Sequence, residues 1–154
     1  MPGCGKSTVA RALSELTGRE LIDTDELIVQ NEGCSIPEIF ASRGEEYFRT
    51  CESRVAAEVG KMSGKIISTG GGIVTREVNL DSLTQNGVIF FVRRDLAMLS
   101  RDGRPLSQGA DLEQMYKKRL PLYLNFADYT VDNCGTVQDC AEAIANIFFN
   151  GGEI

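Results

Sequence analysis

The stretch Gly3-Cys4-Gly5-Lys6-Ser7-Thr8 decides the fold of this chain. Residues 1–7 fit the last seven positions of G-x-x-x-x-G-K-[ST], the pattern of a phosphate-binding loop. In such a loop the glycines let successive backbone N–H groups form a concave nest around phosphate oxygens, and the dipole of the following helix adds positive potential. The lysine reaches the β and γ phosphates, and the serine hydroxyl binds Mg²⁺. We therefore expect Lys6 and Ser7 to take these two roles.

A glycine-rich turn that only opens a helix would give the same short string of residues. Val9, Ala10, Leu13 and Leu16 recur at helical spacing directly after the loop, and Gly18 follows them as a helix end. The loop therefore does open a helix. On these residues alone the simple turn and the phosphate site remain alternatives, and the rest of the chain has to decide between them.

The expected sheet lacks its first strand. A phosphate-binding loop normally follows a buried strand, which holds it at the carboxyl edge of a parallel sheet. Here only Met1 and Pro2 stand before Gly3, and the opening glycine of the pattern has no counterpart. Because a missing central strand leaves the backbone groups of its neighbours unpaired, we expect this polypeptide by itself to be unstable or inactive.

The composition predicts a single domain over residues 1–154. The chain has 154 residues, of which 42% are hydrophobic, enough for a buried core. A net charge of -6 argues against nucleic acid and against a membrane surface as partners. No apolar run has the length of a bilayer span, so a cytoplasmic location is expected. The five cysteines show no paired spacing and are expected to be reduced thiols.

Two aspartates follow the first expected strand. Residues 19–23 are expected to form a short strand that ends on Asp23, and Asp25 comes two residues later. An α/β sheet binds its ligands at the carboxyl ends of its parallel strands. The alternative is helix capping, with Asp25 as the N-cap. Since the sequence contains no histidine, a carboxylate is the expected proton acceptor, and the nearby phosphate loop favours a ligand-facing role for both aspartates.

Three further strands are expected at residues 65–69, 88–92 and 129–131. The second is apolar on both faces, as a central parallel strand should be. The first runs into Gly70-Gly71-Gly72, where the backbone N–H groups are open to a ligand, with a flexible turn as the alternative. Helices are expected from Ser35 with an interruption at Gly44, then over 45–60, 79–83 and 93–100, and from Asp111 and Thr136.

Arginines mark two places where an anionic ligand could bind. Arg49 follows Glu45 by four residues, so an exposed helical ion pair is the ordinary explanation for it. Residues 101–110 are polar, flanked by glycine and without periodicity, a composition typical of a mobile lid. Arg104 lies in this segment, and the alternative is a surface loop with an incidental arginine.

A further arginine, Arg119, lies in a basic cluster near the end of the helix that Asp111 is expected to cap. A solvated helix face is the ordinary explanation for such a cluster. Pro121 follows directly and is expected to break or kink this helix.

Taken in order, the motifs G-C-G-K-S-T, D-T-D, F-R, G-G-G, R-P-L and R-x-P-L-Y resemble those of shikimate kinase, from residue 2 to near the C-terminus. The resemblance implies a three-layer α/β/α fold of the P-loop NTPase class. Its parallel sheet has the family order 2-3-1-4-5, with the first strand absent from this chain. It also implies ATP-dependent phosphorylation of the 3-hydroxyl of shikimate, in the pathway to chorismate and the aromatic amino acids.

The resemblance also implies a role for each motif residue. Asp25 contacts the substrate hydroxyls as the candidate base, and Asp23 joins Ser7 near Mg²⁺. Arg49 and Arg119 bind the shikimate carboxylate together with the Gly71 backbone. Arg104 closes over the phosphates and shares catalysis with Lys6 and Asp25. The ATP-binding residues implied are Gly3, Cys4, Gly5, Lys6, Ser7, Thr8 and Arg104.

Other functions remain open at this point. A gluconate kinase-like enzyme would share the loop, although it lacks the set formed by Arg49, Gly71 and Arg119. An adenylate-type kinase would need a second nucleotide site. A nucleotide-binding or inactive fragment is the rival from another class, because the loop lacks its supporting strand. The expected partners are ATP and shikimate with Mg²⁺, and the expected state is a monomer.

Overall fold

The computed structural model describes residues 5–94 and 106–151, with side chains of the second range described from Glu113 onward. Its strands form two parallel pairs. β1 (Leu21–Asp23) pairs with β2 (Ile66–Ser68), with Ile22 opposite Ile67. β3 (Phe90–Arg93) pairs with β4 (Tyr129–Asp132), with Phe91 opposite Thr130. The predicted α/β class with parallel strands is confirmed.

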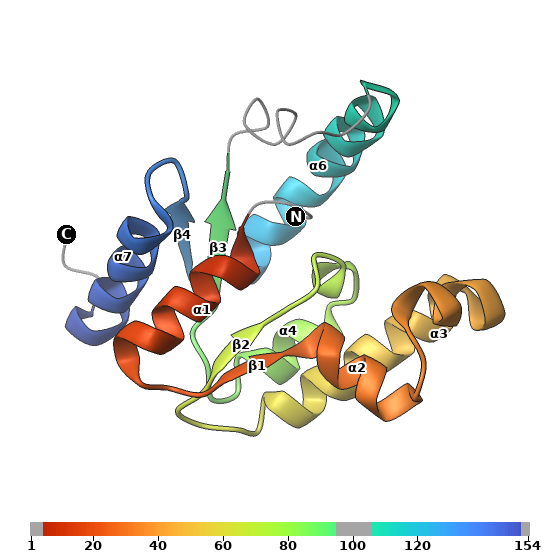
Figure 1. The fold of residues 1–154 in the computed structure, drawn as a ribbon, viewed down its shortest axis with the longest axis horizontal. Helices are drawn as coiled ribbons and strands as arrows, with labels where there is room; N and C mark the ends of the chain where they lie inside the picture. Colours follow the sequence, from red (N-terminus) through yellow and green to blue (C-terminus); the bar gives the residue numbers. More distant parts are fainter. Residues whose placement is uncertain (1–4, 95–105, 152–154) are drawn as a thin grey trace.

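The two pairs correspond to the outer halves of the expected order 2-3-1-4-5. Within the described residues, no strand lies between β2 and β3. Helix α1 (Lys6–Thr17) runs across the space between the pairs in Figure 1. It contacts both β2 and the closing helix α7 (Val137–Asn150). The chain therefore builds two half-sheets on either side of α1.

Three apolar clusters hold the helices to the strands. α2 (Thr24–Glu32) and α3 (Ile36–Val59) pack on the β1–β2 pair. α1 and α7 pack on the β3–β4 pair. The third cluster joins α3 and β3 to the 3-10 turn η1 (Ile73–Thr75) and to α6 (Leu106–Phe126). None of the helices in the described part of the chain is both long enough and apolar enough to cross a membrane.

Local chemistry explains most helix ends, with one correction. The Asp23 carboxylate accepts a hydrogen bond from the Asp25 backbone N–H at 2.9 Å, so Asp23 is the N-cap of α2, and the alternative in which Asp25 caps the helix is wrong. The helix begins two residues earlier than a cap at Asp25 would allow, because buried Thr24 already has helical geometry. Gly44 interrupts α3 as predicted, with a φ of 80° that a residue with a Cβ rarely adopts.

Helix α6 begins earlier and ends later than the sequence indicates. It starts at Leu106, which removes residues 106–110 from the irregular lid predicted over 101–110, and residues 101–105 lie outside the described part. Pro121 lies inside the helix, which continues to Phe126, so the predicted break is wrong. Tyr123 and Phe126 are buried in the third cluster, and this burial offsets the hydrogen bond that proline removes.

The contact between α3 and α4 (Val78–Leu83) depends on a missing side chain. A Cβ on Gly60 would lie 2.0 Å from the backbone oxygen of Ser82. That oxygen belongs to a helix and cannot turn aside as a flexible side chain would.

Gly60→Ala is therefore expected to lower the free energy of unfolding by about 3 kcal/mol, at the upper end of what overpacking costs. Urea denaturation measures this change. Glu58→Ala, an exposed substitution two residues away in α3, is the matched control and should change stability by less than about 0.5 kcal/mol. Equal effects of the two substitutions would contradict the close packing of α3 against α4.

Candidate active site

The site begins where the phosphate loop enters α1. Gly5 is the N-cap of α1, with a φ of 83°, in the left-handed region that favours glycine. A Cβ at Gly5 would lie 2.8 Å from the side-chain nitrogen of Asn133, a buried residue that directly follows β4. Glycine is thus required here for two reasons. Gly3 and Cys4 lie outside the described residues.

Asn133 is a residue of this site that the sequence does not reveal. Its backbone N–H donates to the carbonyl of Arg93 at 2.7 Å, which extends the β3–β4 ladder by one step. This pairing fixes the asparagine against the phosphate loop. Only the sheet register brings residues 5 and 133 together.

Asp25 lies in an environment that disfavours its charge. Its Oδ1 is buried and has no hydrogen-bond partner. Burial raises the pKa of the Asp25 carboxyl, the nearby Asp23 carboxylate raises it further, and the positive charges of Lys6 and Arg49 oppose this. Since Lys6 acts on Asp25 electrostatically, the loop lysine and the expected base share one site. A carboxylate with a raised pKa is better suited to accept a proton than an exposed one.

The charged side chains of the site lie against the backbone of the Gly70-Gly71-Gly72 loop. A Cβ on Gly70 would lie 2.8 Å from the Asp25 carboxylate and 3.0 Å from that of Glu52. A Cβ on Gly72 would lie 1.9 Å from Nη1 of Arg49. The sequence predicts a backbone that faces a ligand. The structure also shows that Gly70 and Gly72, which have no Cβ, leave room for side chains from α2 and α3.

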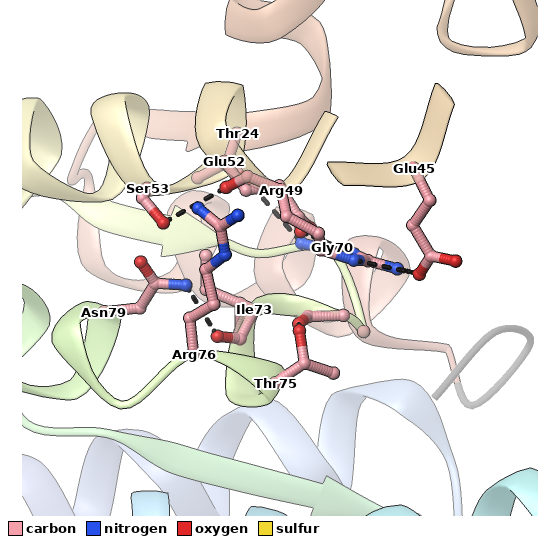
Figure 2. Close-up of polar contacts among 12 residues, drawn as sticks. Thr24, Glu45, Arg49, Glu52, Ser53, Gly70, Ile73, Thr75, Arg76 and Asn79 are labelled. Atoms are coloured by element: carbon pink, nitrogen blue, oxygen red, sulfur yellow. Dashed lines mark hydrogen bonds and ion pairs between the residues drawn. The ribbon is translucent and has the colours of Figure 1, made fainter. Parts of the chain in front are cut away.

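The guanidinium group of Arg49 is held by two glutamates of its own helix. Its Nη1 donates to Glu52 Oε2 at 2.5 Å, and its Nη2 donates to Glu45 Oε1 at 2.8 Å. Figure 2 shows the arginine beside Gly70, with the Glu45 carboxylate at the end of the guanidinium group. The Glu45–Arg49 helical pair considered from the sequence therefore exists. The arginine side chain is nevertheless only 12% exposed and lies against the glycine loop, so it is more than a solvated pair.

Glu52 is a second site residue that the sequence did not single out. Its side chain is 2% exposed. Burial raises the pKa of the Glu52 carboxyl, Arg49 opposes this, and the Asp25 charge adds to it. The spacing of three residues from Arg49 in a helix is the signal that could have found it. Glu52 holds the guanidinium group in place while Asp25 lies close by.

Arg119 reaches the same loop from α6. Its Nη1 donates to the Gly71 carbonyl at 3.4 Å, and the Tyr123 hydroxyl donates to that carbonyl at 2.7 Å. The positive charge of Arg119 also lowers the pKa of the Glu45 carboxyl, after the larger effect of Arg49. Arg119 therefore contacts the same glycine loop against which Arg49 lies, and it is not merely part of a solvated face. Arg104 lies outside the described residues.

The described part of the chain contains no cluster of three or more His, Cys, Asp or Glu side chains that could hold a metal ion by themselves. Mg²⁺ does not need one, since it keeps several waters and uses one or two protein ligands with substrate phosphates. The exposed Ser7 at the start of α1 and Asp23 at the end of β1 fit that requirement. One Asp23 oxygen already serves as the α2 cap.

A lysine at the start of a helix that opens from glycine, near a buried carboxyl group and an arginine, is typical of P-loop phosphotransferases. A family model described as shikimate kinase matches residues 2–148. A shikimate kinase of Acinetobacter baumannii (strain AYE) is 38% identical over 96% of this chain and 88% of its own. One of Dehalococcoides mccartyi is 39% identical over 84% of this chain and 78% of its own. The chain belongs to the shikimate kinase family.

Solved structures agree. A shikimate kinase from Acinetobacter baumannii in complex with shikimate aligns with a TM-score of 0.89 at 33% identity, covering 97% of this chain and 89% of the other. The shikimate kinase of Aquifex aeolicus aligns with a TM-score of 0.85 at 28% identity, covering 98% and 93% of the two chains. The fold and the family inferred from the ordered motifs are confirmed.

Asp25→Asn is expected to stabilise the protein at neutral pH. Because the folded state raises the Asp25 pKa, the unfolded chain releases this proton first as the pH passes about 3.9. The free energy of unfolding of the wild type then falls until the pH exceeds the pKa of Asp25 in the folded state. Asn does not ionise, so the variant does not lose this stability.

Thermal unfolding at a series of pH values tests this expectation. The difference in Tm between Asp25→Asn and wild type should grow above about pH 4 and then level off. Asp81→Asn, at an exposed position of α4, is the control and should show no such growth. Equal stability of the wild type and Asp25→Asn at neutral pH would show that the buried Asp25 carboxylate does not destabilise the folded state.

Proposed function

We propose that this protein transfers the γ-phosphoryl group of ATP to the 3-hydroxyl of shikimate, giving shikimate 3-phosphate and ADP. Membership of the shikimate kinase family supports the reaction class. The observation that carries the proposal is the convergence of Asp25, Arg49 and Arg119 on the Gly70-Gly71-Gly72 loop. The related enzyme from Acinetobacter baumannii that was solved with shikimate supports the same substrate.

The substrate carboxylate is assigned to the two arginines. A planar guanidinium group can donate two parallel hydrogen bonds to a carboxylate, which a lysine cannot do. Glu45 and Glu52 hold Arg49, and the Gly71 carbonyl holds Arg119. The carboxylate therefore meets donors that are already oriented, so little side-chain freedom remains to be lost on binding.

Asp25 is assigned the role of base. In the proposed step a bond forms between the 3-hydroxyl oxygen and the γ-phosphorus, and the bond from that phosphorus to the β,γ-bridging oxygen breaks. The hydroxyl proton passes to the Asp25 carboxylate. The raised pKa of this carboxyl lessens the mismatch between the two partners in the proton transfer.

The phosphates of ATP are assigned to the loop before α1, residues 3–8. The backbone around Gly5 and the N-terminus of α1 attract phosphate oxygens, and Lys6 adds a full positive charge. Ser7 and Asp23 would hold Mg²⁺, which when bound neutralises charge on the phosphates. Arg104 is proposed to close over the transferring group. We further propose that the protein works as a monomer in the cytoplasm.

ADP release measured separately with shikimate, gluconate and AMP tests the substrate assignment. In a preparation that cooperative unfolding shows to be folded, we expect ADP release that depends on shikimate and requires added Mg²⁺. Gluconate and AMP should give no more than the ATP hydrolysis seen without acceptor. Gluconate is an open chain with no ring to fix its carboxylate and a hydroxyl at the spacing set by the paired arginines and Asp25, and AMP has no carboxylate. Turnover with gluconate in place of shikimate would overturn the assignment.

Replacing an arginine by lysine tests the carboxylate site. Arg49→Lys and Arg119→Lys keep the charge but lose the planar fork, so each should raise the KM for shikimate by about tenfold or more, as expected for a lost hydrogen bond between charged groups. The KM for ATP should stay near its wild-type value. Steady-state kinetics with each substrate varied in turn measures both constants.

Arg43→Lys is the matched control for these substitutions. Arg43 also lies in α3 and pairs with a glutamate, Glu32, but its side chain is 53% exposed. Both KM values should stay unchanged in this variant. Equal changes in the KM for ATP and for shikimate in Arg49→Lys would place the arginine outside the shikimate site.

A further inference from the structure

The three carbonyl groups of the glycine loop have partners of two kinds. The Gly70 carbonyl accepts a hydrogen bond from the Ile73 N–H at 3.2 Å. The Gly72 carbonyl accepts from the N–H of Thr75 at 2.9 Å and from its hydroxyl at 2.7 Å. These bonds stay within the loop and the turn η1 that follows it. The Gly71 carbonyl instead accepts from two side chains of α6, so the middle of the loop is tied to a distant helix.

Tyr123 supplies the shorter of the two bonds from α6. Its hydroxyl lies 2.7 Å from the Gly71 oxygen, whereas Nη1 of Arg119 lies 3.4 Å from that oxygen. The second distance is longer than the usual range of an N–H···O hydrogen bond. The two side chains are four residues apart in α6 and so lie on the same face of the helix. The tyrosine hydroxyl is thus the main partner that α6 gives to the Gly71 oxygen.

The ring of Tyr123 is held in place by apolar packing. Tyr123 is 6% exposed, and its ring stacks on that of Phe91 in β3 with the ring centroids 5.0 Å apart. It belongs to the same apolar cluster as Ile73 and Val74, the two residues that follow the glycine loop. A buried tyrosine usually directs its hydroxyl at a hydrogen-bond partner. The hydroxyl therefore has a fixed place beside the loop.

The glycines make the direction of the middle peptide depend on this hydroxyl. Glycine has similar access to positive and negative φ, so a peptide unit between two glycines turns over at little steric cost. The unit that joins Gly71 to Gly72 is of this kind. Its own residues give its carbonyl no preferred direction. A donor outside the loop is needed, and the hydroxyl of Tyr123 is placed to be that donor.

The same hydrogen bond sets the direction of an N–H group. In a trans peptide the carbonyl and the N–H point in opposite directions. With the Gly71 carbonyl turned toward α6, the Gly72 N–H is turned away from α6. A Cβ on Gly72 would lie 1.9 Å from Nη1 of Arg49, so Gly72 itself lies against this arginine. The N–H thus belongs to the part of the loop to which the substrate carboxylate is assigned.

We propose that Tyr123 is a positioning residue of the acceptor site, whose hydroxyl fixes the Gly71–Gly72 peptide so that its N–H donates to the substrate carboxylate. The inference rests on the proposed function, because this carboxylate is the one assigned to Arg49 and Arg119. The hydroxyl has a second effect on the same site. Since it supplies the main bond to the Gly71 oxygen, Arg119 needs only a long contact there and keeps its other donors for the carboxylate.

Tyr123→Phe removes the hydroxyl and keeps the ring that stacks on Phe91. In a preparation that cooperative unfolding shows to be folded, we expect the KM for shikimate to rise about fivefold, the size of one lost neutral hydrogen bond. The kcat and the KM for ATP should stay within about twofold of the wild type, because the carboxylate is bound equally in the ground state and in the transition state. A hydroxyl that serves only stability would lower the Tm and leave the KM for shikimate unchanged.

A measurement without ligand tests the orientation of the peptide itself. In nuclear magnetic resonance spectra of protein with isotopically labelled glycine, the amide signal of Gly72 should shift or split in Tyr123→Phe. The reason is that the Gly71 carbonyl loses its main partner on α6, so the peptide no longer has one direction. This readout requires neither ATP nor shikimate.

Tyr47→Phe is the matched control. The Tyr47 hydroxyl donates to Glu32 Oε2 at 2.8 Å, so this variant also loses one tyrosine hydrogen bond, but the bond joins α2 to α3 and does not involve the glycine loop. Both KM values and the Gly72 amide signal should stay as in the wild type.

Two unnatural side chains separate the effect of the donor from that of shape. Para-fluorophenylalanine at position 123 fills the space of the hydroxyl without donating a hydrogen bond, and it replaces Tyr123→Phe if that variant does not unfold cooperatively. Para-aminophenylalanine at this position keeps a donor. It should restore the KM for shikimate to within about twofold of the wild-type value.

Three results would each overturn the proposal: an unchanged KM for shikimate in the variants without a donor, an equal rise in the KM for ATP, or an unmoved Gly72 amide signal. Absence of shikimate-dependent turnover in the folded wild type is a different result, which overturns the proposed function. The amide signal is recorded without ligand, so it still decides whether the hydroxyl orients the peptide.

Discussion

The close approach of charged side chains to the Gly70-Gly71-Gly72 backbone is the constraint on which the site depends. Arg49 lies so near Gly72 that a single Cβ would overlap its guanidinium group, and the carboxylates of Asp25 and Glu52 meet Gly70 in the same way. Three elements distant in sequence, α2, α3 and the loop after β2, are thereby fixed relative to one another. Arg119 and Tyr123 bring α6 to the same loop through the Gly71 carbonyl.

This packing concentrates like and unlike charges in a small volume of an acidic protein. The chain carries a net charge of -6, yet Lys6, Arg49 and Arg119 gather where two anionic ligands are proposed to bind. The acidic partners serve different purposes: Glu45 and Glu52 orient Arg49, whereas Asp25 keeps an unpartnered oxygen. A buried oxygen without a partner costs stability. Its retention is understandable if a substrate hydroxyl supplies the missing contact.

The sheet shows how far local sequence signals reach. Strand positions, parallel pairing, the Gly44 interruption and most helix caps follow from apolar runs, glycines and capping residues, because each is determined within a few residues. The errors fall where distant packing competes with a local rule. Pro121 fails to end α6 because Tyr123 and Phe126 are buried against η1 and β3. The capping role that was considered as an alternative for Asp25 belongs to Asp23, because helical geometry begins at buried Thr24.

By itself the sequence determined the family and the loop that opens α1, and it led to the proposed set Asp25, Arg49, Gly71 and Arg119, because their identity and order are recorded in short motifs. The tertiary structure alone decided the contact of Asn133 with Gly5 and the burial of Glu52 beside Arg49. The first joins residues from separate elements, and the second depends on the packing of α3 against the loop at Gly70. Such distances are set by sheet register and helix packing, which no local pattern records.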